Sequence, residues 1–156
     1  MAADQLDVLA IGNAIVDVLA HTDDVFLIEN KIEKGAMTLI DADGATALYD
    51  NMPPAVEISG GSAANTAVGV ASLGGQAAYI GKVCDDQLGK VFAHDIRAAG
   101  VQFDTAPATE GAPTARCLIL VTPDAQRSMN TFLGACVDLT PDDIDEALVA
   151  SARITY

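Results

Sequence analysis

The stretch Gly60-Gly61-Ser62-Ala63-Ala64-Asn65 lies between a short apolar segment at residues 56–58 and a run of small residues at 63–73 with the pattern of a buried helix. Two consecutive glycines leave this turn without a Cβ, so its backbone N–H groups can approach a ligand closely. Asn65 lies four residues beyond Gly61, and on a helix that starts near Ser62 its amide points back over the turn. The stretch therefore predicts a strand, a turn and a helix that together can hold a polyhydroxylated small molecule.

Strands and helices are expected to alternate along the rest of the chain. This alternation predicts a mostly parallel, doubly wound α/β sheet. The turn at 122–125 predicts an antiparallel hairpin between the strands beside it, and Asp23 (or Thr22), Asp41 and Thr140 are expected helix N-caps. The expected strands are residues 8–11, 15–21, 36–40, 56–58, 77–83, 116–121, 128–133 and 154–156, and the expected helices are 23–29, 41–51, 63–73, 86–99 and 141–151.

The composition is that of a chain with an aliphatic core. Apolar residues make up 51% of the 156 residues and aromatic residues only 4%, and this length is sufficient for one domain. The net charge is −14, from 22 acidic and 8 basic residues. Such a surface repels nucleic-acid phosphates and anionic lipids, so we expect neither a nucleic-acid partner nor a membrane partner.

The cysteines and the amino terminus indicate the cellular compartment of the protein. Cys84, Cys117 and Cys136 are widely spaced, which argues against a disulfide framework and a zinc site. No basic segment precedes the first apolar stretch, residues 6–11, and this stretch is too short for a signal core or a membrane span. These features predict a protein of the reducing cytoplasm.

A second polar loop, Gly12-Asn13-Ala14-Ile15-Val16-Asp17, follows the first expected strand. In open α/β sheets, ligands bind outside the carboxyl ends of the strands. Asn13 can donate and accept hydrogen bonds, and Asp17 can accept from two hydroxyl groups of one sugar. Taken alone, each loop has the chemistry of an ordinary turn, with Ser62 as a helix N-cap. Together, the loops would bring polar groups from two strand ends into one crevice.

Both loops resemble signatures of one family, the ribokinase (PfkB-type) sugar and nucleoside kinases. Gly12-Asn13-x-x-x-Asp17 is similar to a motif of adenosine-kinase-like members, and Gly60-Gly61-x-x-x-Asn65 to the turn that holds ribose hydroxyls. The resemblance continues through residues 78–89, where Cys84 replaces a usual glycine, and through residues 127–135. It implies a substrate-binding set of Asn13, Asp17, Gly60, Gly61, Ser62 and Asn65, with Leu133 and Ala135 near a nucleoside base.

The same resemblance implies a ribokinase-like α/β fold. It consists of a mostly parallel central sheet with helices on both faces and a small β lid near residues 16–21, 36–40 and 116–133. The family's second signature, which supplies the catalytic aspartate and a glycine-rich phosphate site, is not found in residues 1–156. We therefore expect an amino-terminal, acceptor-binding part of a kinase domain, without a catalytic residue or a metal site and inactive alone, because the nucleotide-binding part lies elsewhere.

The activity that the resemblance implies is ATP-dependent transfer of the γ-phosphoryl group to a primary hydroxyl. The first acceptor is the adenosine 5′-OH, with ribose or another sugar next, and the cofactors are ATP and Mg²⁺. A homo-oligomer formed through the lid strands is kept open. Two other classes are also kept: a non-catalytic sugar- or nucleoside-binding module, and a nucleotide-dependent oxidoreductase, which the missing Gly-x-Gly-x-x-Gly fingerprint argues against.

Overall fold

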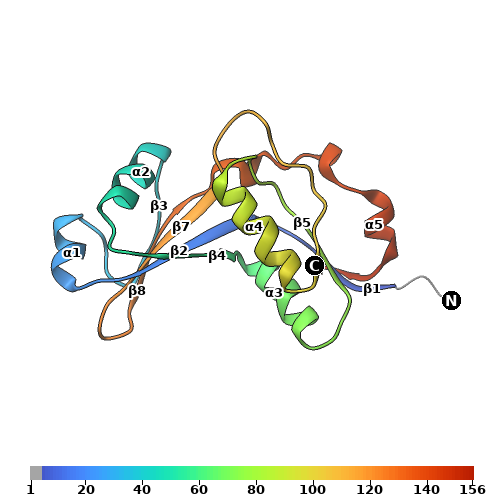
Figure 1. Ribbon diagram of the computed structural model, residues 1–156, viewed down its shortest axis with the longest axis horizontal. Helices are drawn as coiled ribbons and strands as arrows, with labels where there is room; N and C mark the ends of the chain where they lie inside the picture. The colour runs from blue at the N-terminus through green and yellow to red at the C-terminus, as the bar shows by residue number, and fades with distance from the viewer. Residues whose placement is uncertain (1–4) are drawn as a thin grey trace.

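Two β-sheets, connected through the loop between β1 and β2, form the framework of the computed structural model, which describes residues 5–156 (Figure 1). The first sheet has four strands in the order β6-β5-β1-β9, and all its neighbouring pairs are parallel. The parallel sheet expected from the alternation of strands and helices is thereby confirmed. Its strands are β1 (Leu6–Ile11), β5 (Ala77–Ile80), β6 (Val101–Gln102) and β9 (Ala152–Thr155).

Helices cover both faces of this first sheet. Successive residues of a strand point to opposite faces, and the two faces of β1 contact different helices. Ala10 belongs to the cluster that contains Ala67 of α3 and Phe92 of α4, whereas Leu9 packs in the cluster that Leu148 of α5 covers. The helices are α3 (Ser62–Ser72), α4 (Gln87–Ala98) and α5 (Glu146–Ser151).

The second sheet is mixed and has five strands in the order β3-β8-β7-β2-β4. β2 runs parallel to β7 and antiparallel to β4, and β7 and β8 form the expected antiparallel hairpin. β4 pairs with β2 along its whole length, an association that the sequence did not indicate. The strands are β2 (Ile15–His21), β3 (Met37–Leu39), β4 (Val56–Gly60), β7 (Ala115–Val121) and β8 (Arg127–Phe132).

Two short helices, α1 (Asp24–Glu29) and α2 (Ala42–Asn51), lie over one face of the second sheet (Figure 1). Leu27 and Leu48 from these helices are buried in the same cluster as Val18 and Leu118 of the sheet. The opposite face presents Asp17 of β2, in register with Cys117 of β7 and Thr131 of β8. The second sheet therefore has a helix-covered face and a face that carries Asp17.

Aspartate side chains cap the start of α1, α2, α4 and α5. The Asp23 carboxylate accepts a hydrogen bond from the N–H of Phe26 at 2.9 Å, and that of Asp41 accepts one from the N–H of Gly44 at 2.8 Å. Asp86 caps α4 and also accepts a hydrogen bond from the N–H of Thr114 at 2.8 Å, just before β7. The caps expected at positions 23 and 41 are confirmed.

The single helix expected at residues 141–151 is wrong. The chain forms a 3₁₀ turn, η2 (Pro141–Asp143), then an extended residue at Ile144, and then α5. Each of these elements has its own N-cap. The expected cap Thr140 starts η2, and the Asp143 carboxylate completes a capping box by accepting from the Thr140 N–H at 2.9 Å. Asp145 starts α5 by accepting from the Leu148 N–H at 3.1 Å. A further 3₁₀ turn, η1 (Gly134–Asp138), follows β8.

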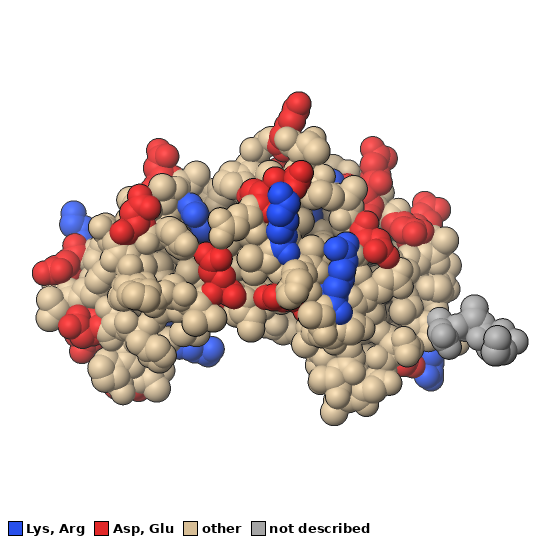
Figure 2. Space-filling view, viewed as in Figure 1, with Lys and Arg blue, Asp and Glu red and all other residues tan. Residues whose placement is uncertain are grey.

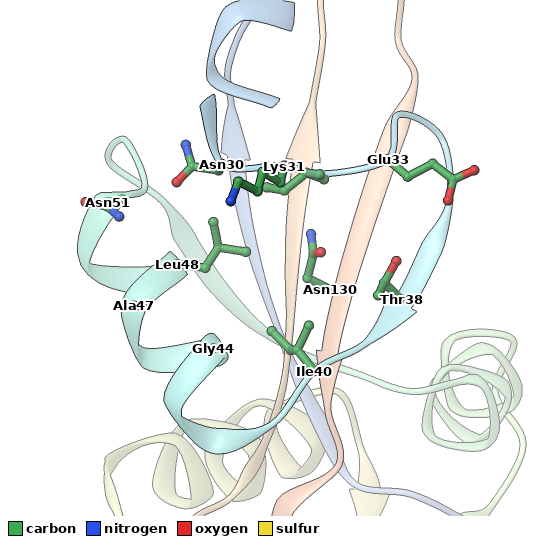
Figure 3. A pocket seen from close by; sticks show the side chains of 11 residues that line it. Asn30, Lys31, Glu33, Thr38, Ile40, Gly44, Ala47, Leu48, Asn51 and Asn130 are labelled. Atoms are coloured by element: carbon green, nitrogen blue, oxygen red, sulfur yellow. The ribbon is translucent and has the colours of Figure 1, made fainter. Parts of the chain in front are cut away.

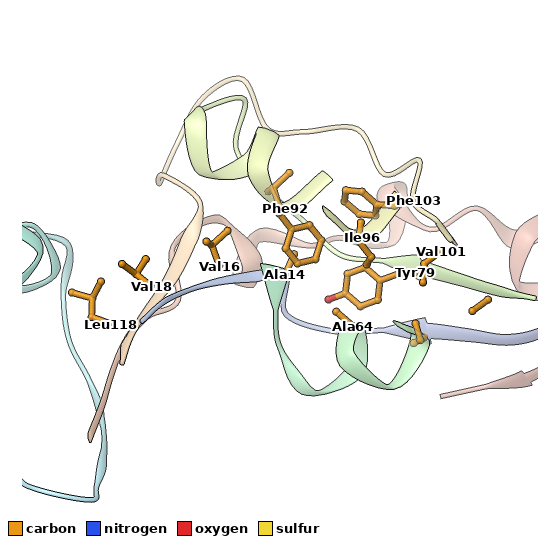
Figure 4. Packing of buried hydrophobic residues seen from close by; sticks show 14 of the residues in the cluster. Ala14, Val16, Val18, Ala64, Tyr79, Phe92, Ile96, Val101, Phe103 and Leu118 are labelled. Carbon is orange, nitrogen blue, oxygen red and sulfur yellow. The ribbon is translucent and has the colours of Figure 1, made fainter. Parts of the chain in front are cut away.

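The core extends through both sheets and is aliphatic except at one place. There Tyr79, Phe92 and Phe103 form an aromatic group in which ring centroids lie 5.4–5.9 Å apart (Figure 4). On the face shown in Figure 2, acidic side chains are distributed over the surface and basic side chains stand singly among them. None of the helices in residues 5–156 is both long and apolar enough to traverse a bilayer.

Candidate functional site: the loops after β1 and β4

The two polar loops singled out in the sequence meet in one cavity. The loop after β1 contributes Gly12 and Asn13, and the turn between β4 and α3 contributes Gly61 and Ser62, to a cavity of about 350 Å³. Tyr156, just after β9, also lines it. The cavity lies at the carboxyl end of β1, which is where ligands bind in open α/β sheets.

Gly61 is required by both backbone conformation and space. Its φ is +93°, in the region that favours glycine, and a Cβ at this position would lie 2.6 Å from the carbonyl oxygen of Asn13. Gly61, not Ser62, is the N-cap of α3, and it offers no side-chain hydrogen bond. The interpretation of Ser62 as the cap is therefore wrong, because Ser62 is already the first helical residue. No side chain among residues 5–156 caps the start of α3, so its first N–H groups are available to another acceptor.

Asp17 lies beside this turn, held by the pairing of β2 with β4. Its carboxyl group contacts the Cα side of Gly60 so closely that a Cβ there would overlap it. The carboxylate is half-buried and accepts no hydrogen bond from residues 5–156. Burial raises the pKa of Asp17, and the positive charge of Arg127 partly opposes this rise. The group thus keeps its full accepting capacity for a ligand at a site partly shielded from water.

Asn65 is tied to the same turn through the backbone. Its N–H donates to the carbonyl oxygen of Gly61 at 2.9 Å, which closes the first turn of α3. Its side chain is exposed and makes no hydrogen bond within the described residues. Among the expected site residues, Asn13, Gly61 and Ser62 line the cavity, whereas Asp17, Gly60 and Asn65 are not among its lining residues. Whether these residues bind a sugar stays a prediction.

The two positions expected near a nucleoside base lie elsewhere. Leu133 is half-buried just after β8, and Ala135 is fully buried in η1, where its N–H donates to the carbonyl oxygen of Pro113 at 2.9 Å. Neither residue lines the cavity at the β1 loop. Their assignment to a base stays a prediction.

A supporting residue that the sequence reasoning missed is Tyr79. Its hydroxyl donates to the carbonyl oxygen of Gly12 at 2.7 Å, and its ring packs on Phe92 and Phe103. Burial raises the pKa of the Tyr79 phenol, so the hydroxyl stays a donor. The only signal in the sequence was an aromatic residue in an otherwise aliphatic strand, since the partner carbonyl lies far away along the chain.

The turn at Cys84, where the sequence departs from the family pattern, has an ordinary conformation. Cys84 is not among the described residues with positive φ. Its N–H donates to the Thr114 hydroxyl at 3.0 Å, which links the turn to the segment before β7. Cysteine is therefore accommodated without backbone strain.

The chemistry available at the cavity is that of binding polar, hydroxylated molecules. The Asn13 amide and the backbone at Gly61 and Ser62 line it. The Asp17 carboxylate contacts the neighbouring Gly60, and Asn65 bonds to Gly61 through its backbone. Together these groups can accept from and donate to several hydroxyls. Within residues 5–156, no three His, Cys, Asp or Glu side chains gather closely enough to hold a metal ion. The expected metal-free character of this part stays a prediction.

Comparison with known sequences identifies relatives of this chain. The sequence pattern of the "pfkB family carbohydrate kinase" group matches residues 29–156. A fructokinase from Solanum tuberosum is 34% identical over 106 residues, which span 67% of this chain and 33% of that protein. An adenosine kinase from Saccharomyces cerevisiae is 30% identical over 158 residues, covering 95% of this chain and 46% of the yeast protein.

Solved structures give the same result for the fold. The crystal structure of adenosine kinase from Sinorhizobium meliloti superimposes with a TM-score of 0.90 and 63% sequence identity, over 99% of this chain. The matched region is 47% of the Sinorhizobium chain. The ribokinase-like α/β fold is therefore confirmed, and the chain spans less than half the length of these relatives.

Proposed function

Because the chain belongs to the pfkB family of carbohydrate kinases, we propose that the whole protein is an ATP-dependent kinase that phosphorylates a primary hydroxyl of a nucleoside or sugar. The observation that carries this proposal is the single cavity formed by the loop after β1 and the turn before α3. Phosphoryl transfer depends mainly on positioning and on charge stabilisation. A cavity that orients the acceptor hydroxyl is what this part of such an enzyme must supply.

In this proposal, the acceptor sugar is held from two sides. Asp17 accepts hydrogen bonds from ring hydroxyls, and in its ionised form these bonds are stronger than neutral ones. The N–H groups at the start of α3, with the amides of Asn13 and Asn65, contact the remaining hydroxyls. Gly60 and Gly61 allow the backbone to approach the sugar. Leu133 and Ala135 would lie near the base.

We propose ATP and Mg²⁺ as the cofactors, to be bound mainly outside the residues described. Magnesium in such sites is held largely by phosphate oxygens and water, and it would neutralise the developing charge on the transferred group. Residues 1–156 are then the acceptor-binding part, inactive alone, without the general base. The second sheet, including the strands near 16–21, 36–40 and 116–133, would act as a lid that excludes water.

Adenosine is the acceptor that we favour. The chain shares 63% identity with the Sinorhizobium adenosine kinase over nearly its full length, against 34% over 67% of its length with the potato fructokinase. Fructose and ribose are therefore the second candidates. Three expectations stay predictions: a cytoplasmic location, the lack of nucleic-acid and membrane partners, and oligomerisation through the lid strands.

The test is an acceptor panel on the full-length protein with ATP and Mg²⁺. We expect the highest kcat/KM for adenosine, lower values for ribose and fructose, and no turnover with residues 1–156 alone. A full-length protein that binds adenosine but phosphorylates none of the three would instead support the non-catalytic binding module. Sustained AMP formation by residues 1–156 would show that the assignment of the catalytic base to another part is wrong.

A further inference from the structure

A second cavity, of about 450 Å³, lies on the helix-covered face of the second sheet. It is bounded by the loop after α1, by α2 and by β8, and Figure 3 shows it open between these three elements. Leu48 and Ile40 give it an apolar wall, and Asn30, Asn51 and Asn130 contribute amides. None of these residues lines the cavity at the β1 loop.

The side chain of Asn130 indicates that the cavity binds a ligand. Its side chain is only 5% exposed, and its Nδ2 atom is buried without a hydrogen-bond acceptor. Figure 3 shows the amide of Asn130 directed into the cavity, below the side chain of Lys31. A buried donor without a partner is costly, and native proteins nearly always satisfy it. An acceptor atom inside the cavity would remove that cost.

Lys31 supplies a positive charge to the same cavity. It makes no ion pair within residues 5–156, in contrast to Lys34 nearby, which pairs with Asp24 at 2.7 Å and Asp124 at 2.8 Å. The acidic residue at the rim, Glu33, points its carboxylate away from Asn130 (Figure 3). The polar end of the cavity therefore presents one cation and one unpaired amide donor.

We propose that this cavity binds a small organic anion, a carboxylate with a short apolar chain. The carboxylate would accept a hydrogen bond from the neutral amide Nδ2 of Asn130 and a charge-assisted, stronger one from Lys31 Nζ. The apolar chain would lie against Leu48 and Ile40. Such a ligand would accept a hydrogen bond from the buried donor, pair with the Lys31 charge and cover the apolar wall. A phosphate would leave the apolar wall in contact with water.

The site is separate from the proposed acceptor site, although Asp17 and Asn130 lie on the same sheet. Asn130 is in register with Leu118 of β7, which is in register with Val18 of β2. Asp17 precedes Val18 and points to the opposite face. Anion and acceptor would therefore occupy opposite faces of the sheet, and neither should displace the other.

Butanoate titrated into the full-length protein tests this proposal by calorimetry and by ligand-observed NMR, with butan-1-ol as the uncharged comparison. We expect saturable binding of butanoate, with a Kd on the order of 1 mM for so small a ligand, and none of butan-1-ol. Asn130→Leu and Lys31→Gly should each weaken binding ~10-fold. Saturating adenosine should leave the affinity for butanoate unchanged.

Two matched variants control for the loss of charge and for the backbone change. Lys90→Gln removes a positive charge from an exposed position on α4. Ala125→Gly introduces glycine at another position with positive φ, as Lys31→Gly does. Both should bind butanoate like the wild type. No saturable binding, equal binding by Asn130→Leu and Lys31→Gly, or competition by adenosine would overturn the proposal. So would a crystal structure grown with butanoate that shows only ordered water on Asn130.

Discussion

The carboxyl group of Asp17 rests against the bare Cα of Gly60, across the antiparallel pair formed by β2 and β4. This contact is possible only because residue 60 has no side chain. It links the two sequence motifs physically: the first supplies the carboxylate, and the second supplies the space in which the carboxylate lies. A change of either Asp17 or Gly60 should therefore disturb the same contact and weaken acceptor binding.

Replacing Asp17 by asparagine tests the role of the charge. Asp17→Asn keeps the shape of the side chain but would lose the charge-assisted hydrogen bonds proposed for Asp17, each of which contributes about 1.5–3 kcal/mol. The kcat/KM proposed for adenosine in the full-length protein should then fall ~10- to 150-fold per bond lost. The measurement is steady-state kinetics, with thermal unfolding to show that the fold is intact. Asp50→Asn, on the exposed side of α2, is the control. Unchanged kinetics in Asp17→Asn would remove Asp17 from the site.

Replacing Gly60 by alanine tests whether the Asp17 carboxyl group needs the space beside residue 60. The added Cβ would overlap the Asp17 carboxyl group, so Gly60→Ala should displace Asp17, raise KM for the acceptor and destabilise the protein by about 1–3 kcal/mol. Gly69→Ala in α3 is a matched control, because a Cβ there meets nothing within 4 Å. That change should stabilise by about 0.5–1 kcal/mol through helix propensity. Equal behaviour of the two variants would contradict the contact.

The raised pKa of Asp17 gives a pH dependence with a defined sign. Burial raises the pKa of Asp17 in the folded state above the ordinary aspartate value of 3.8. The folded state therefore binds the Asp17 proton more tightly than the unfolded state, and this group's contribution to stability falls as pH rises from the unfolded pKa through the folded pKa. Acceptor affinity should change in the opposite direction, because the ionised carboxylate is the better acceptor.

Both effects are isolated by comparing the wild type with Asp17→Asn. The difference in unfolding free energy between the two proteins, measured by urea titration across the acid range, should favour the wild type more at lower pH. The wild type should lose acceptor affinity as the pH falls toward the raised pKa, and Asp17→Asn should not. A pH-independent difference in both measurements would mean that Asp17 is not perturbed by burial.

Tyr79 should support the β1 loop through one hydrogen bond. Tyr79→Phe leaves the ring packing intact and removes the donor to the Gly12 carbonyl oxygen, 2.7 Å away. We expect a loss of about 1 kcal/mol of stability and a modest rise in KM for the acceptor, since Gly12 lines the cavity. Denaturant unfolding and acceptor kinetics are the measurements. Tyr49→Phe, whose hydroxyl bonds Glu57 at 3.0 Å on the surface, should have a smaller effect on both.

The features that the sequence predicted correctly are those with local causes. Asp23 and Asp41 cap their helices through atoms three residues away, so a short window of sequence contains the whole interaction. The glycine turn before α3 is local in the same way. The break at Ile144 was missed because Thr140 and Asp145 are both good N-caps, and each starts an element of its own.

Features that depend on distant partners could not be predicted in this way. The pairing of β4 with β2 and the bond from Tyr79 to Gly12 join residues far apart in sequence. The cavity at Asn130 depends on three such elements at once. An asparagine in a β-rich segment gives no sign that its amide is buried without a partner.

Lys31 occupies the position at which a helix of this kind usually ends in glycine. After α1, the N–H of Ile32 donates to the carbonyl oxygen of Leu27 at 2.8 Å and that of Lys31 to the carbonyl oxygen of Ile28 at 3.1 Å. This is the Schellman pattern of helix ends. Lys31 has φ +56° there, a conformation that L-residues other than glycine resist.

Lys31→Gly should therefore stabilise the protein by about 1 kcal/mol, although it removes a cation from the second cavity. Ala125→Gly, at φ +64°, should give a similar gain, and urea unfolding of the full-length protein measures both. If Lys31 serves binding at a cost in stability, Lys31→Gly should raise the free energy of unfolding and weaken butanoate binding. If both quantities fell together, loss of the fold around α1 would explain the weaker binding, and Lys31 would have no separate role in the cavity.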